Sequence, residues 1–78
     1  MLEHIKVLIF KEGHRFVARA SGLLISEVGS TEKEALTNLK KAIAALHKDY
    51  GLKRYPEDSL DEQAAMKKVT IAVEMKKK

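Results

Sequence analysis

The chain contains no cysteine, and this absence excludes two ways of stabilising a small protein. At 78 residues it is near the size at which a single hydrophobic core only just suffices, and neither a disulfide framework nor a thiolate metal site can supplement that core. No apolar run approaches the roughly 20 residues that span a bilayer. The first residues lack the basic and apolar regions of a secretory signal. We therefore expect a cytoplasmic domain held together by its own packing.

Amide and aromatic side chains are also scarce. Asn38 and Gln63 are the only amides beside 12 lysines and 8 glutamates, a bias typical of proteins from hot environments. Phe16 lies between Arg15 and Arg19, which loosely resembles the platforms on which single-stranded RNA bases stack. Because no aromatic partner lies near it on a neighbouring strand motif, we expect Phe16 to pack in the core instead.

The basic charge of the chain lies mostly at its C-terminus. The net charge is +4, and the flexible tail 76–78 supplies three of these units, so the remaining body has 12 basic and 11 acidic residues. Such a tail can add non-specific affinity for phosphates, whereas a dedicated nucleic-acid surface needs a basic body. If the chain binds nucleic acid, the candidate contacts are Arg15, Arg19, Lys76, Lys77 and Lys78.

Alternating apolar residues predict four strands. The runs 4–11, 15–20, 23–28 and 67–76 are rich in β-branched and apolar types and are separated by glycine or polar turns. In the first strand, alternation predicts one face with Ile5, Val7 and Ile9 and another with Lys6, Leu8 and Phe10. The last strand should bury Val69, Ile71, Val73 and Met75.

The segment from Gly29 to Leu36 predicts a helix start. Thr31 can accept a hydrogen bond from the main-chain N–H of Glu34, and the Glu34 side chain can reach back to the N–H of Thr31, which is a capping box. We expect the helix to cover about 32–50 and to end at Gly51. Its apolar stripe consists of Ala35, Leu36, Leu39, Ala42, Ile43, Leu46 and Tyr50. Ser59 and Glu62 offer a second capping box, which predicts a short helical segment over 60–66.

These elements predict an α+β fold of β-β-β-α-β order in a single domain, residues 1–78. The first three strands form an antiparallel meander, and a right-handed crossover through the helix predicts a fourth strand parallel to the first. The result is a mixed four-stranded sheet of order 3-2-1-4 with one main helix on one face. Leu8, Phe10 and Val17 would occupy the uncovered face, so we expect a homodimer or a larger homo-oligomer.

No constellation of residues indicates catalysis. His4, His14 and His47 lie on different elements without a metal-ligand spacing, and inward positions of the strands are apolar rather than acidic. No nucleophile-elbow or phosphate-loop pattern occurs. We therefore expect no enzyme activity, no cofactor, and no catalytic or metal-binding residue.

The run from Phe16 to Tyr50 resembles the HicB-like antitoxin family. The resemblance lies in a glycine turn that leads into Thr-x-x-Glu-Ala-Leu, then Asn-Leu and an alanine-rich helix. The matching residues are Gly29, Thr31, Glu34, Ala35, Leu36, Asn38, Leu39, Ala42 and Ile43. With the flanking strands it extends over nearly the whole chain, and it implies a partial ribonuclease H-like domain without the catalytic acids.

This resemblance implies a non-catalytic module that binds and masks a small ribonuclease toxin of the HicA type. The family often binds DNA through an added module, and because no such module follows the last strand, DNA binding is not expected. Two alternatives remain open. One is a small nucleic-acid-binding protein that uses Arg15, Arg19 and the lysine tail, and the other is a structural or regulatory homo-oligomer.

Overall fold

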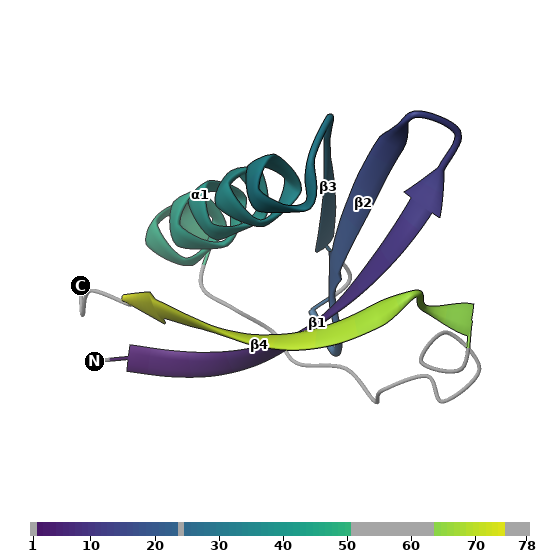
Figure 1. Cartoon of the computed structure of the whole chain (residues 1–78). Coiled ribbons are helices and arrows are strands. Elements are labelled where there is room, and N and C mark those ends of the chain that lie inside the picture. The colour runs from purple at the N-terminus through teal and green to yellow at the C-terminus, as the bar shows by residue number, and fades with distance from the viewer. Residues whose placement is uncertain (1, 24, 51–63, 75–78) are drawn as a thin grey trace.

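In the part of the chain that the structure describes, four strands and one long helix follow one another in the predicted order (Figure 1). The computed structural model describes residues 2–23, 25–50 and 64–74. The elements are β1 (Leu2–Glu12), β2 (Arg15–Ala20), β3 (Ile25–Gly29), α1 (Glu32–Tyr50) and β4 (Lys67–Glu74). The predicted bounds of β2 and α1 are confirmed, whereas β3 begins two residues later than predicted. The proposed capping box of Ser59 and Glu62 and the lysine tail lie outside the described residues.

The strands form one sheet in the order β3-β2-β1-β4, which confirms the predicted order. The predicted direction of the last strand is wrong. Every neighbouring pair is antiparallel, including β1 with β4, whose register pairs Ile5 with Ile71 and Val7 with Val69. The sheet is therefore antiparallel throughout rather than mixed.

The length of the connection after α1 explains this difference. The crossover rule predicts a strand parallel to β1 when a short connection follows the helix, because the strand then starts near the C-terminal end of α1. Here β4 begins beside the start of α1, where Lys67 Nζ lies 3.3 Å from Glu32 Oε2. The 16 residues between Tyr50 and Lys67 can extend about 50 Å. The 19-residue helix is roughly 28 Å long, so the chain is long enough to return past the helix before β4 begins.

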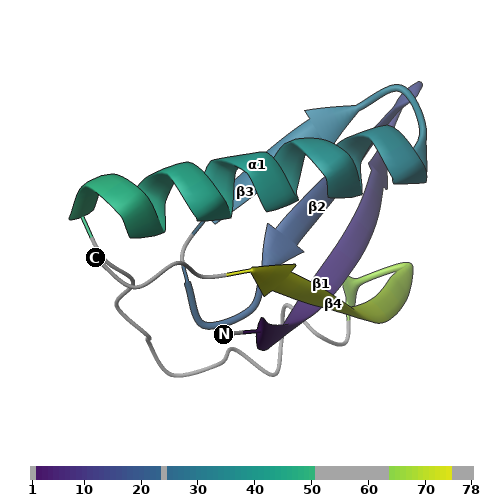
Figure 2. The same cartoon turned by 90° about the vertical axis from the view of Figure 1, so that its left-hand side faces the viewer.

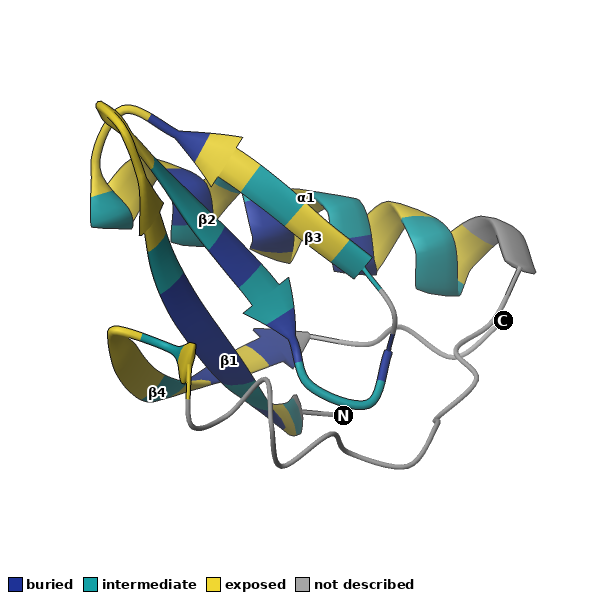
Figure 3. Ribbon diagram, turned by 90° about the vertical axis from the view of Figure 1, so that its right-hand side faces the viewer, coloured by how far each residue is buried: buried dark blue, intermediate teal, exposed yellow. Residues whose placement is uncertain are grey.

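The core lies between the sheet and α1. The helix crosses one face of the sheet (Figure 2) and contacts β3, β2 and, less extensively, β4. Buried residues alternate with more exposed ones along β2, β3 and β4, whereas β1 has a continuous buried stretch over Val7, Leu8 and Ile9 (Figure 3). The buried cluster consists of Ile5, Val7, Ile9, Ala18, Ala20, Leu23, Ala35, Leu39, Ile43, Ile71 and Val73. The predicted inward faces of β1, β4 and α1 are confirmed for these members, while the side chains of Tyr50 and Met75 lie outside the described part of the chain.

Phe16 packs against this core, as predicted. It lies directly opposite Gly29 in the β2–β3 register. An aromatic ring across from a strand glycine can cover the backbone that the glycine leaves bare. Lys11 Nζ lies 5.9 Å from the centre of the Phe16 ring, within the range of a cation–π contact.

The first turn of α1 is capped, with one difference from the prediction. The N–H of Glu34 donates to Thr31 Oγ1 at 3.0 Å, and the N–H of Ala35 donates to the Thr31 carbonyl. The Glu34 carboxylate, however, accepts at 3.0 Å from the N–H of Ser30 rather than from that of Thr31, and also from the Ser30 hydroxyl at 3.3 Å. The carboxylate thereby ties the helix start to the residue that follows β3.

Gly29 is needed because the helix start lies almost against it. A Cβ at this position would lie 2.4 Å from the main-chain N of Ala35 and 2.9 Å from Glu34 Cβ. Main-chain atoms in the first turn of a helix cannot move aside as a flexible side-chain end does. The strand-to-helix turn therefore admits no side chain at position 29.

We expect Gly29→Ala to lower the free energy of unfolding by about 2 kcal/mol or more, because the added methyl overpacks a buried contact. Gly13→Asn is the matched control, since Gly13 has a positive φ of 61° and a Cβ added there would meet no atom within 4 Å. Asparagine tolerates this backbone region, so its effect should stay below about 1 kcal/mol. Urea unfolding followed by circular dichroism measures both, and equal losses would contradict the close-approach explanation.

Candidate functional site

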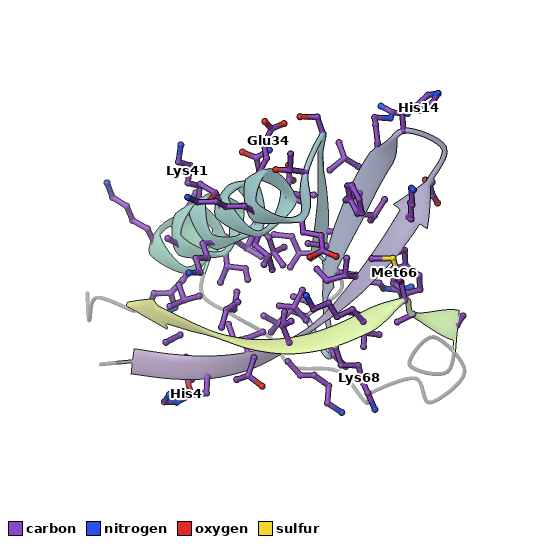
Figure 4. All side chains as sticks on the ribbon, viewed as in Figure 1. His4, His14, Glu34, Lys41, Met66 and Lys68 are labelled. Atoms are coloured by element: carbon purple, nitrogen blue, oxygen red, sulfur yellow. The ribbon has the colours of Figure 1, made fainter. Side chains whose placement is uncertain are left out.

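The face of the sheet that points away from α1, here called the outer face, carries a band of apolar and cationic side chains. Strand registers assign its residues, because side chains directly opposite each other share a face. Its described members are His4, Lys6, Leu8, Phe10, Glu12, Arg15, Val17, Arg19, Ser26, Val28, Lys68, Thr70 and Ala72. Figure 4 shows His4 and Lys68 on the side of the sheet opposite α1.

Three apolar residues form a row across three strands of this face. Phe10 of β1 pairs with Val17 of β2, which pairs with Val28 of β3. Val28 is 45% exposed, and Phe10 and Val17 are half-buried. This apolar row (Phe10, Val17 and Val28) is therefore accessible to a binding partner.

The prediction that Leu8 contributes to an uncovered surface is wrong. Leu8 lies on the outer face as expected, but only 2% of its surface is exposed. The register places it in the second strand from the edge, between Arg19 of β2 and Lys68 of β4. The aliphatic stems of such long side chains can cover a neighbouring apolar residue, so the accessible apolar surface begins at Phe10.

The outer face is more basic than the sequence indicated. Arg15 and Arg19, two of the predicted nucleic-acid contacts, share it, and the register adds Lys6 and Lys68. Among the described side chains of this face, Glu12 is the acidic one, and it pairs with Arg15. The strand alternation predicted Lys6 on this side, and it leaves Lys68 there as well because the odd-numbered residues of the last strand were expected to be buried. Only the strand order brings all four cations onto one surface.

Two observations limit what these cations offer to a phosphate. Lys6, Arg19 and Lys68 each already take part in an interaction within the folded chain, so phosphate binding would compete with these interactions. The other predicted contacts, Lys76, Lys77 and Lys78, lie outside the described residues. The structure thus brings together Arg15 and Arg19 and leaves their relation to the tail undescribed.

The histidines do not converge. His4 lies on β1 and His14 in the turn between β1 and β2, far apart in Figure 4, and His47 lies near the end of α1. Within the described residues, no group of three or more His, Cys, Asp or Glu side chains is placed to hold a metal ion. In the same part of the chain, no helix combines the length and apolarity required to cross a membrane.

Asn38 links the helix to an edge of the sheet. Its Nδ2 donates to the carbonyl of Val28 on edge strand β3 at 2.9 Å. The bond satisfies a carbonyl on the outer edge of β3 and keeps this strand aligned with α1. β3 carries Val28, one end of the apolar row. Asn38 therefore has a structural reason to be an amide.

Comparisons with protein-family models, with curated proteins and with solved structures found no match to this chain.

We expect Asn38→Asp to lower the free energy of unfolding by about 1 kcal/mol or more, because a carboxylate cannot donate to the Val28 carbonyl. Thr37→Asp is the matched control, since it introduces the same group at an adjacent exposed position of α1. Amide hydrogen exchange should show reduced protection along β3 in the first variant only. Equal loss of protection in both would mean that the added charge, not the lost donor, is responsible.

Proposed function

We propose that this domain is a non-catalytic binding module of the antitoxin type, which sequesters a small ribonuclease toxin in the cytoplasm. The observation that supports this proposal most directly is the accessible apolar row on the outer face. A soluble protein gains by covering such a surface with a partner, because burial of apolar area drives protein association. The resemblance to the HicB-like family supplies the class of partner.

Sequestration requires a complementary surface and no bond-making chemistry. The residues that carry the family resemblance have structural tasks: Gly29 permits the close approach of α1, Thr31 and Glu34 cap it, and Asn38 joins it to β3. They hold the helix on one face of the sheet and leave the opposite face for contact. A bound toxin would lose access to RNA by steric occlusion.

The apolar row has the composition of a small interface centre. Its aromatic and branched residues lie among Arg15, Arg19 and Ser26, which supply a polar surround that can remain hydrated. Interfaces commonly combine an apolar centre with a polar rim, and arginine is enriched in them. Because the rim is cationic, the matching surface of the toxin would be neutral or acidic and would lie beside its basic RNA site rather than on it.

We expect a small ribonuclease encoded beside this chain to lose activity when the domain is added in equal amount. Val28→Glu should weaken that inhibition by roughly tenfold or more, because it places a charge in the apolar centre of the interface. Thr37→Glu, on the exposed surface of α1, should inhibit as the unchanged chain does. The readout is cleavage of a fluorescent RNA over a titration of the domain.

Failure to inhibit the neighbouring ribonuclease, despite a folded domain by circular dichroism, would refute the toxin as partner. Equal inhibition by both variants would instead move the binding surface away from the apolar row. The two results are independent, because the first concerns the identity of the partner and the second concerns the place of contact.

A second candidate function, binding to single-stranded RNA, is favoured by the cations that share the outer face with Phe10. Base stacking on an exposed strand aromatic, flanked by arginines that hold the backbone, is a common mode of such binding. Phe10 lies beside Arg15 and Arg19 through its pairing with Val17. The interactions that Arg19 and two of the lysines already make count against this candidate.

If RNA binding is the function, the logarithm of the affinity should fall linearly with the logarithm of salt concentration. Arg15→Ala combined with Arg19→Ala should reduce the slope by roughly 0.7 for each lost phosphate contact. Lys40→Ala with Lys41→Ala, on the exposed surface of α1, is the charge-matched control. Equal slopes for the two double variants, measured by fluorescence anisotropy, would exclude the outer face as an RNA site.

A further inference from the structure

The central part of β4 lacks the features that protect edge strands. β4 ends the sheet on one side and has eight residues, whereas β3 on the other side has five. Positions 69–73 contain no charged residue and no proline, although natural edge strands usually carry such residues to prevent pairing with another chain. On β3, in contrast, Asn38 already occupies the carbonyl of Val28.

The alternation of main-chain hydrogen bonds along the strands shows which N–H and C=O groups of β4 point away from β1. The N–H of Ser21 donates to the carbonyl of Lys6 at 2.9 Å, at a position that continues the β1–β2 register. Even-numbered residues of β1 therefore bond to β2, and odd-numbered ones bond to β4. Since Ile5 pairs with Ile71, the odd-numbered residues of β4 bond to β1. The N–H and C=O groups of positions 68, 70, 72 and 74 are directed away from β1.

We propose that two copies of this chain pair through these groups, with β4 antiparallel to β4 of the second copy. The two-fold axis passes through Ile71, and the two sheets become one continuous sheet. The interface is isologous, because each copy contributes the same strand edge. This inference depends on the strand edge alone and goes beyond the proposed function.

Several registers allow the outward main-chain groups of the two copies to form hydrogen bonds, and the charges of the facing side chains favour this one. Outward groups meet only when even-numbered positions lie opposite even-numbered positions. With the axis at Ile71, Lys68 lies opposite position 74, a glutamate, twice by symmetry, and Thr70 lies opposite Ala72. An axis at Thr70 would leave Lys68 opposite Ala72, where it meets no opposite charge. Opposite charges on facing positions stabilise strand pairs, and like charges destabilise them.

The side of β4 that faces the helix layer agrees with the same register. Ile71 would meet its own counterpart, and Val69 would meet Val73, so that apolar residues continue across the junction. Ile71 and Val73 are buried within one copy, while Val69 is half-buried. Because α1 lies mainly over β3 and β2, the helices of the two copies would lie apart and would not crowd the junction.

Sedimentation equilibrium of the full chain, with no partner present, tests the proposal. We expect a monomer–dimer equilibrium for the unchanged chain and loss of the dimer in Thr70→Pro, whose missing N–H points outward and so removes no bond to β1. Ser26→Pro is the matched control on the β3 edge and should retain the dimer. A chain that stays monomeric at all concentrations, or a Ser26→Pro variant that loses the dimer as fully as Thr70→Pro, would overturn the proposal.

Charge reversal tests the register without proline. Lys68→Glu and Glu74→Lys should each raise the dimer Kd by roughly tenfold, because two symmetric pairs change from attraction to repulsion. The two substitutions together should restore the Kd to within about threefold of its original value, since both pairs regain opposite charges. If the combined variant dimerises no better than the single ones, the register centred on Ile71 is refuted.

Discussion

The close approach of Gly29 to the first turn of α1 is the constraint on which the rest of the structure depends. A Cβ at this residue would lie 2.4 Å from the main-chain N of Ala35, so the helix can begin here only against a bare backbone. Thr31 and Glu34 then satisfy main-chain donors at the turn. Together these contacts set the direction in which α1 crosses the sheet and thereby determine which face of each strand is buried.

Once α1 covers one face, the outer face and the two edges are left for interaction. The outer face combines the apolar row with cations, which suits a protein partner with a neutral or acidic surface better than it suits a basic one. The edges differ because Asn38 occupies the Val28 carbonyl on β3, whereas β4 ends the sheet on the other side. The apolar row lies on β1, β2 and β3, whereas the proposed pairing of two copies uses β4, so the two proposals place their contacts on different strands.

Local patterns in the sequence predicted much of this fold. The bounds of β2 and α1 and the inward positions of the strands follow from spacing, turn residues and caps, each of which acts over a few residues. The strand order was predicted from the meander and the crossover rule, although that rule gave the wrong direction for β4. Three local details were predicted wrongly: Glu34 accepts from Ser30 rather than from Thr31, β3 begins at Ile25, and β1 covers Leu2–Glu12 rather than 4–11. Of the candidate site, Arg15 and Arg19 were identified, whereas Lys6 and Lys68 were assigned to a side but not recognised as their neighbours.

The sequence by itself determined which residues form strands and helix, and which side of each element is apolar, because these properties depend on short-range periodicity. Only the tertiary structure decided that β4 runs antiparallel to β1, since 16 residues after α1 are long enough to enter the sheet from either end. It also decided that Leu8 is buried while Phe10 stays accessible, because burial on the outer face depends on which side chains of neighbouring strands lie opposite. Those pairings join residues far apart in the chain, and no local pattern specifies them.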